Sequence, residues 1–220
     1  MFSFYGSKKS KAHLYPKPDN DVIIEPFAGA AGYSVLHRKH NVLLYDIDPR
    51  IVTVWQYLID AHPKDILSLP MFGPGERIDS FGLSEPEKLF LGYMISAAAC
   101  NPKKTATIKT NWNLNKQHQI ANFVTEIKHW KVARSDFRNV TNIKATWFID
   151  PPYEDAGKWY DYKLKSRDFF ELTEFCKSRQ GQVIVCENLG ANWLPFMPLY
   201  QINGQKNNKR TEAIWTTNNE

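Results

Sequence analysis

The sequence has few cysteines and no apolar run long enough to cross a membrane. Only three of its 220 residues are cysteines, and they form no Cys-x-x-Cys pair, so neither a disulfide framework nor a zinc site is predicted. Lysines near the N-terminus are followed by no apolar stretch, which argues against an export signal. We expect a soluble protein of the reducing cell interior.

The composition favours a folded domain with a slightly basic surface. Apolar residues make up 43% of the chain, which is enough for a substantial core in one domain, or in one domain with an insert. There are 28 lysines and arginines against 23 acidic residues, giving a formal net charge of +5 and a pI near 9.0. This balance is compatible with a polyanionic partner such as nucleic acid.

The most informative stretch is Asp-Pro-Pro-Tyr at residues 150–153, which follows an apolar run typical of a buried strand. Two prolines cannot continue a sheet ladder, so the chain must leave the sheet there. Ligands of open α/β sheets bind beyond the carboxyl ends of the strands, which predicts that Asp150 and Tyr153 project into a site.

This turn suits the chemistry of an exocyclic amine on a nucleobase, which is a weak nucleophile. The Asp150 carboxylate and a carbonyl at Pro151 or Pro152 would accept the two amine hydrogens and favour the pyramidal nitrogen. Tyr153 offers a ring for base stacking, a contact worth roughly 1–3 kcal/mol. On these residues alone, a sharp strand exit with Asp150 as a turn former remains an open alternative.

A second group of small and acidic residues predicts a nucleoside site. Residues 22–34 are typical of a buried strand that passes through a glycine-rich turn into a helix, where the backbone can approach a ligand. Asp46 and Asp48 end the next strand, residues 42–48, roughly twenty positions later, where a ribose hydroxyl is bound in nucleoside-binding sheets. The two signals agree in spacing, which favours a bound nucleoside over simple strand caps.

Two further segments are candidates for cofactor contacts. Asp136 follows a strand predicted at residues 131–135 and could accept from the adenine amine of a cofactor, with Phe137 packed on the ring; a turn-forming aspartate is the alternative. Near the N-terminus, Tyr5 could approach a ligand and Lys8 could meet a carboxylate. A basic surface arm with buried aromatics explains the same residues.

The organisation of the chain predicts a sheet domain with an insert. Strands alternate with helices and a hairpin ends the chain, which implies an α/β, doubly wound, mostly parallel sheet with an antiparallel edge. Residues 1–69 and 131–220 would form the sheet domain, and residues 70–130 an inserted helical region. Basic residues in polar loops, in the segment after the turn and at the hairpin are candidate DNA contacts: Lys103, Lys104, Lys109, Lys158, Lys209 and Arg210.

Together these motifs resemble the Dam-like, D12-class family of DNA adenine-N6 methyltransferases in their alpha-group order. Residues 150–153 match the catalytic motif residue by residue, and residues 4–8, 25–32, 46–48, 136 and 210–213 resemble the remaining motifs in sequence order. The chain departs from the family at Ala31, where many members have a glycine that falls here one place later.

The resemblance implies a seven-stranded Rossmann-like sheet that binds S-adenosylmethionine and methylates the N6 amine of a flipped adenine in double-stranded DNA, without a metal. The implied cofactor contacts are Tyr5, Lys8, Glu25, Phe27, Ala28, Gly29, Asp46, Asp48, Asp136, Phe137 and Asp150, and the implied catalytic residues are Asp150, Pro151, Pro152 and Tyr153. It also implies that residues 1–69 and 131–220 form the cofactor-binding catalytic domain and that residues 70–130 form the DNA target-recognition region. The implied location is the cytoplasm of a bacterial or phage-infected cell, with or without a cognate restriction nuclease. Three alternatives stay open: methylation of cytosine N4, methylation of RNA or protein glutamine, and a catalytically silent DNA-binding module.

Overall fold

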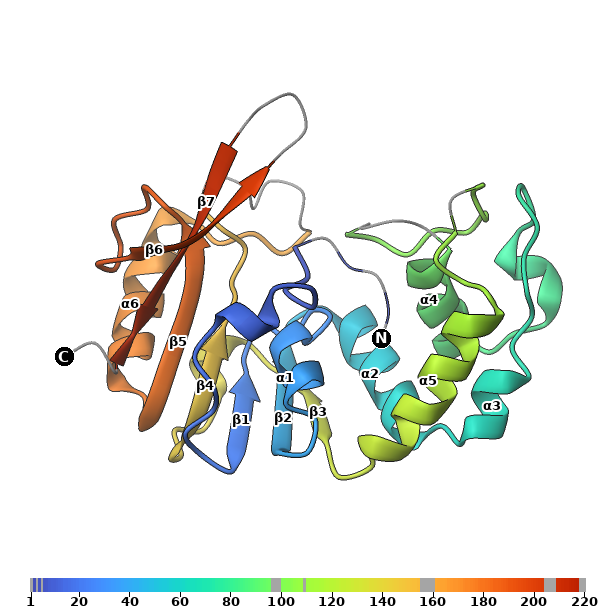
Figure 1. The fold of residues 1–220 in the computed structure, drawn as a ribbon, viewed down its shortest axis with the longest axis horizontal. Helices are drawn as coiled ribbons and strands as arrows, with labels where there is room; N and C mark the ends of the chain where they lie inside the picture. The colour runs from blue at the N-terminus through green and yellow to red at the C-terminus, as the bar shows by residue number, and fades with distance from the viewer. Residues whose placement is uncertain are drawn as a thin grey trace.

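The computed structural model describes residues 2, 4, 6–95, 100–108, 110–154, 161–203 and 209–217. Its described strands form a seven-stranded sheet in the order β3-β2-β1-β4-β5-β7-β6 (Figure 1). They are β1 (Val22–Glu25), β2 (Asn41–Asp46), β3 (Lys131–Arg134), β4 (Ala145–Ile149), β5 (Gly181–Asn188), β6 (Met197–Asn203) and β7 (Lys209–Thr216). The first five strands pair in parallel, and β7 runs antiparallel to both β5 and β6. The predicted fold class is confirmed.

Helices connect the parallel strands and cover the sheet. The α-helices are α1 (Gly32–Leu36), α2 (Pro49–Asp60), α3 (Pro63–Leu67), α4 (Glu85–Met94), α5 (Leu114–Glu126) and α6 (Ser166–Ser178). Short 3-10 helices are η1 (Ala12–Leu14), η2 (Ile78–Phe81) and η3 (Phe137–Asn139). None of these described helices combines the length and the apolar character that a bilayer span requires.

Alternate residues of the central strands enter two separate cores, one on each face of the sheet. On β4, Phe148 packs into the core that α1, α2, α4 and α5 share, whereas Trp147 and Ile149 pack into the core under α6. On β5, Ile184 packs into the first of these cores and Val183 into the core under α6. Because both faces of the sheet are covered, these strands are continuous apolar runs in the sequence, a pattern that predicts buried strands.

Several element boundaries differ from the sequence-based expectation. Strand β2 ends at Asp46 instead of residue 48, because the Asp48 side chain caps α2 by accepting from the Arg50 backbone N–H. Asn203 and Lys209 belong to the strands of the terminal hairpin, which is longer than predicted. Its interstrand pairing extends to Asn203 and Lys209, beyond the apolar positions on which the shorter prediction rested.

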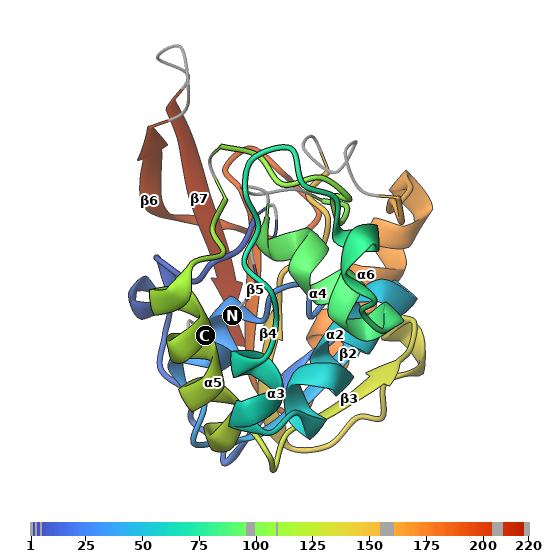
Figure 2. The same cartoon turned by 90° about the vertical axis from the view of Figure 1, so that its right-hand side faces the viewer.

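The described part of residues 70–130 packs against α2 and α3 of the sheet domain. Helix α4 begins with the predicted capping box, in which Ser84 and Glu87 exchange hydrogen bonds with each other's backbone. Its Phe90 and Tyr93 belong to the same apolar cluster as Trp55 of α2. Figure 1 shows α3, α4 and α5 gathered at one end of the molecule, and in Figure 2 this end faces the viewer. A continuous core therefore joins this region to the sheet, and its role as a target-recognition unit stays a prediction.

Candidate active site

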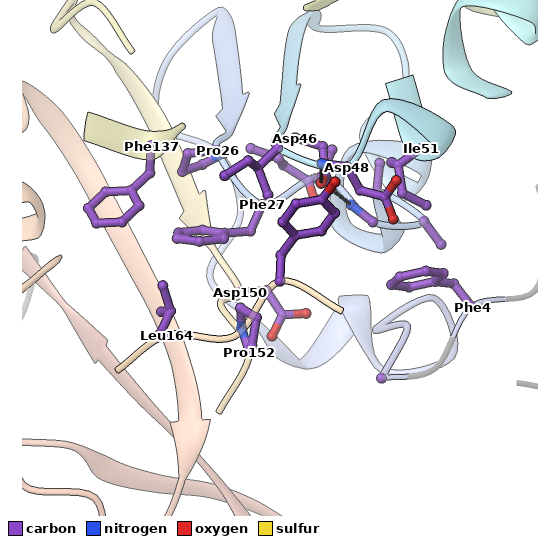
Figure 3. Close-up of a pocket in the computed structure, with 18 of the residues that line it drawn as sticks. Phe4, Pro26, Phe27, Asp46, Asp48, Ile51, Phe137, Asp150, Pro152 and Leu164 are labelled. Atoms are coloured by element: carbon purple, nitrogen blue, oxygen red, sulfur yellow. Dashed lines mark hydrogen bonds between the residues drawn. The ribbon is translucent and has the colours of Figure 1, made fainter. Parts of the chain in front are cut away.

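A cavity lies at the carboxyl ends of β1, β2 and β4, where the sequence predicted a site (Figure 3). The predicted site residues that line it are Lys8, Glu25, Phe27, Ala28, Gly29, Asp46, Asp48, Asp136, Phe137, Asp150 and Pro152. Pro151 and Tyr153 stand beside it without lining it, and Tyr5 lies outside the described residues. The structure thus brings the glycine-rich turn, the acidic end of β2 and the Asp150 turn to one cavity.

The glycine-rich turn after β1 is held by backbone contacts. Gly29 has a φ of 44°, and a side chain there would lie 3.2 Å from the ring of Phe4. Its N–H donates to Asp46 Oδ2 at 2.9 Å, and its carbonyl accepts from Trp55 Nε1 at 2.8 Å. Ala31 has the left-handed φ of 45°, a conformation that a glycine adopts without strain. The substitution noted in the sequence therefore leaves the turn intact but strained.

The end of β2 presents two carboxylates to the cavity. Asp46 accepts from the N–H groups of Gly29 and Asp48, each at 2.9 Å, and burial raises its pKa to about 6. Asp48 is only 8% exposed and is bound by the Arg50 side chain. Carboxylate oxygens can each accept more than one hydrogen bond, so this pair suits the hydroxyls of a ribose.

Arg50 is a cavity residue that the sequence reasoning missed. Its guanidinium contacts Asp48 at 2.5 Å, Asp161 at 2.7 Å and Asn101 Oδ1 at 2.8 Å, so it joins three segments of the chain. A basic residue two positions after Asp48 signals only a local ion pair. The link to residue 161, which is 111 positions away, has no sequence signal.

At the other end of the cavity, Asp136 and Phe137 are engaged by neighbours. The Asp136 carboxylate accepts from the Arg138 backbone N–H at 3.0 Å and pairs with the Arg138 guanidinium at 2.9 Å. That guanidinium lies 4.5 Å above the ring of Phe137, whose centroid is 5.4 Å from that of Phe27. A ligand at this end would bind a carboxylate, that of Asp136, which Arg138 already binds. It would also contact the ring of Phe137, a residue that is only 3% exposed.

Glu25 is a buried acid at the end of β1. Its side chain accepts from the Ser34 backbone N–H at 2.8 Å, which ties the strand to the start of α1. Burial raises the pKa of Glu25 to about 8. The carboxyl group is therefore mostly protonated at neutral pH and can donate as well as accept a hydrogen bond.

Asp150 is paired with a buried lysine from the N-terminal segment. Lys8 Nζ lies 3.1 Å from Asp150 Oδ1 and 3.2 Å from Oε1 of Glu212 on β7. Burial raises the pKa of Asp150, and Lys8 opposes that shift. Burial lowers the pKa of Lys8, but the neighbouring carboxylates outweigh it and the net shift is upward. The sequence indicated Lys8 as the partner of an unspecified carboxylate and gave Glu212 no role of its own.

Tyr153 is fixed through its hydroxyl group and one face of its ring. The hydroxyl accepts from Lys8 Nζ at 2.5 Å and donates to Glu212 Oε1. The same ammonium lies 4.6 Å from the ring centroid. Burial raises the pKa of Tyr153, so the group stays a neutral phenol. Stacking of a base on the ring stays a prediction.

Glu187, at the end of β5, anchors the backbone that follows the Asp150 turn. Its carboxylate accepts from the Glu154 N–H and from Trp193 Nε1, each at 3.3 Å, and from the Asn188 N–H at 2.7 Å. The side chain is buried, and burial raises its pKa to about 7. The available sequence signal for this residue was a glutamate inside an apolar strand, and no role was predicted for it.

The candidate DNA contacts lie on two projections beside the cavity. Lys103 and Lys104 are exposed on a loop that pairs with residues 75–78, and Arg210 is exposed on β7. Figure 1 shows this loop and the β6–β7 hairpin rising on opposite sides of the carboxyl edge of the sheet. The described residues exclude Lys109 and Lys158 entirely and the side chain of Lys209.

Comparison with known proteins yields only distant similarities. No protein-family model and no curated protein sequence matches the chain. A solved rRNA methyltransferase, AviRa from Streptomyces viridochromogenes, aligns with 94% of this chain and 80% of its own at 12% identity and a TM-score of 0.42. The putative methyltransferase YhhF from Escherichia coli aligns with 89% and 74% at 11% identity and a TM-score of 0.39. The glycopeptide N-methyltransferase MtfA aligns with 96% and 75% at 8% identity and a TM-score of 0.41. Scores this low carry no argument about the activity of this chain.

Proposed function

We propose that the protein is an S-adenosylmethionine-dependent methyltransferase that modifies the N6 amine of adenine in DNA. The observation that carries this proposal is that Asp150 opens onto the same cavity as Gly29 and Asp46. Such a transfer requires a site for the cofactor and a group that holds the amine. The nucleoside-type site would lie beyond β1 and β2, and the Asp150 carboxylate beyond β4 would hold the amine. The motif order described above supports adenine as the base.

The charge of the cavity fits this cofactor. Among the described residues that line it, seven are acidic and four are basic. The acidic residues are Glu25, Asp46, Asp48, Asp136, Asp150, Asp161 and Asp168, and the basic ones are Lys8, Arg50, Arg138 and Lys163. Even with Glu25 protonated, the acidic residues outnumber the basic ones, and this excess of negative charge favours a ligand with net positive charge. Asp46 and Asp48 would hold the ribose, and the close backbone approach at Gly29 would hold the amino acid end.

S-adenosylmethionine, when bound, supplies a methyl group on a positively charged sulfur. Asp150 would accept one hydrogen of the target amine, and a carbonyl at Pro151 or Pro152 would accept the other. The amine nitrogen would form a bond to the methyl carbon as the bond from that carbon to sulfur breaks and leaves its electron pair on sulfur. The nitrogen would then lose one proton, which the Asp150 carboxylate can hold. Positioning and charge placement account for the rate, with no covalent enzyme intermediate.

The target base must leave the DNA stack to reach the Asp150 turn, which costs a few kcal/mol. The face of the Tyr153 ring opposite Lys8 would recover part of that cost by stacking. Lys103, Lys104 and Arg210 lie on the two projections that flank the cavity, and they would contact phosphates of a duplex between them.

The proposal is tested by offering methyl-labelled cofactor together with duplex DNA, RNA or protein. After transfer, the DNA is digested and the modified nucleoside is identified by mass spectrometry. We expect labelled N6-methyladenine from DNA with the wild-type protein and none with Asp150→Ala, a variant whose folding is checked by circular dichroism.

Each alternative predicts a different outcome of that experiment. Labelled N4-methylcytosine would reassign the base, and label in RNA or protein alone would reassign the substrate. Binding of DNA without transfer to any acceptor would support the catalytically silent module.

A further inference from the structure

Three segments that are far apart in the sequence meet at the Lys8 ammonium group. It lies 3.1 Å from Asp150 on the turn after β4 and 3.2 Å from Glu212 on β7. The Lys8 and Glu212 side chains are only 9% and 2% exposed. In Figure 3 the Asp150 carboxylate is directed toward the N-terminal segment that carries Phe4. The candidate catalytic carboxylate thus adjoins a buried ion pair.

Lys8 and Glu212 also bind the hydroxyl group of Tyr153, the aromatic residue of the turn. Tyr153 accepts from Lys8 and donates to Glu212, whose Oε1 also accepts from Tyr15 Oη at 2.8 Å. Glu212 therefore makes three contacts through one oxygen, two of them with residues that touch Asp150 or belong to its turn. Removing it would release the carboxylate side and the ring side together.

We infer that Glu212 is a positioning residue for the proposed reaction, acting through Lys8 and Tyr153 to orient the Asp150 carboxylate. This inference rests on the proposed function for its chemistry, but the contacts themselves can be tested without it. Lys8 Nζ contacts both Glu212 and Asp150, so loss of the Glu212 carboxylate would change where the ammonium group sits and thereby the orientation of Asp150.

The charge balance gives the inference a distinctive signature. Lys8, Asp150 and Glu212 sum to one negative charge. Burial raises the pKa of Asp150 and repulsion from Glu212 raises it further, so neutralising Glu212 should lower that pKa, whereas neutralising Lys8 removes the attraction that opposes the shift and should raise it. Other titratable groups also face Asp150. They are Tyr153 on its own turn, Glu25 on β1, Cys186 and Glu187 on β5, and Tyr15 near the N-terminus. All of these groups are unchanged in the two Glu212 variants described next.

Two substitutions of Glu212 test separately the charge and the length of its side chain. Glu212→Gln keeps the shape and an acceptor oxygen but loses the charge, whereas Glu212→Asp keeps the charge but is shorter. We expect Glu212→Gln to lower the pKa of Asp150, observed as a carboxyl carbon titration by NMR and assigned by its loss in Asp150→Asn. Glu212→Asp should leave that pKa close to the wild-type value.

Single-turnover methyl transfer to DNA provides the second readout. Both variants should slow the transfer about tenfold or more, because misplacing a reacting group by a fraction of an ångström has effects of this order. Only Glu212→Gln should move the acid limb of the pH profile to lower pH. Tyr15→Phe removes a donor to the same oxygen without a bond to Asp150, and its rate should stay within about twofold of wild type.

The outcomes distinguish this inference from the proposed function. An Asp150 titration and a transfer rate that are the same in Glu212→Gln as in wild type would overturn the inference. If Glu212→Gln fails to fold, an unchanged transfer rate in Glu212→Asp would overturn it as well. A wild-type protein that transfers no methyl group would refute the proposed function, while the NMR titration would still decide whether Glu212 controls Asp150.

Discussion

The two halves of the cavity are built in different ways. Asp46, at the nucleoside end, is held by the backbone N–H groups of Gly29 and Asp48, which are 17 and 2 positions away in the sequence. Asp150, at the proposed catalytic end, is paired with Lys8, whose hydrogen bond to Tyr153 spans 145 positions. One half depends on local backbone geometry, and the other on side chains that only the folded chain brings together.

This difference determines how each half responds to substitution. Backbone donors remain in place when a nearby side chain changes, so the Asp46 end should tolerate conservative replacements. The Asp150 end includes two carboxylates and one ammonium group in a buried space, where the loss of one partner leaves the others uncompensated. We expect the catalytic end to be the more sensitive in stability as well as in activity.

The largest expected effect is on stability and comes from Lys8→Met. This variant leaves the buried Glu212 and the half-buried Asp150 without their cation, and we expect the free energy of unfolding to fall by about 3–5 kcal/mol. The matched change at the other end, Asp46→Asn, weakens hydrogen bonds to two backbone donors and should cost about 1–3 kcal/mol. Urea titrations of both variants measure the difference. Equal losses would remove the distinction between the two halves.

Asp150→Asn should separate chemistry from binding. Replacing the carboxylate by an amide removes the charge that favours the developing positive nitrogen, and we expect single-turnover transfer to fall about 10²–10³-fold. The affinity for the cofactor, measured by calorimetry, should change much less, because Asp46 and Asp48 are untouched. A variant that loses cofactor binding but retains its transfer rate at saturation would contradict these assignments.

The sequence was sufficient to predict the half that is locally encoded. The apolar runs of β1, β4 and β5, the small residues around Gly29 and the acids at the end of β2 are short-range patterns, and each lies where it was expected. The capping box at Ser84 was predicted for the same reason.

The contacts of the other half could not be predicted, because they depend on topology. Glu212 meets Tyr15 across 197 positions, since β7 inserts antiparallel beside β5. The cofactor half also has contacts that were not predicted: the pairing of Arg50 with Asp161 is distant in sequence, whereas the pairing of Asp136 with Arg138 is local and forms in the η3 turn. A lysine was indicated near a carboxylate, but its two partners were not.

Stability should depend on pH through Glu25, the buried acid that lies between the two halves of the cavity. Glu25 has its pKa raised by burial to about 8, whereas the unfolded chain releases this proton near 4.5. The folded state therefore binds more protons in that window, and stability should fall as pH rises through it. Glu25→Gln should flatten the slope measured by urea unfolding between about pH 6.5 and about pH 8.5. Glu187, with its pKa raised to about 7, supplies the slope that remains. A slope unchanged by Glu25→Gln would contradict the burial of an ionisable Glu25.

The smallest expected effect tests the strain in the glycine-rich turn. Ala31→Gly relieves the left-handed backbone and should raise the free energy of unfolding by up to about 1 kcal/mol after the entropy of the unfolded chain is counted. Ala30→Gly is the matched control, because Ala30 lacks a positive φ and should lose about 1 kcal/mol. Thermal unfolding of the pair should show shifts of opposite sign. Shifts of the same sign would show that the turn is not strained.

The measurement that tests the central claim most directly is single-base sequencing of duplex DNA treated with the cofactor and either wild-type protein or Asp150→Asn. It reports activity, base and sequence context together. We predict N6-methyladenine at a restricted set of contexts with the wild-type protein and almost none with the variant. Equal modification by both proteins, or modification only at cytosine, would contradict the role of Asp150 as the residue that holds an adenine amine.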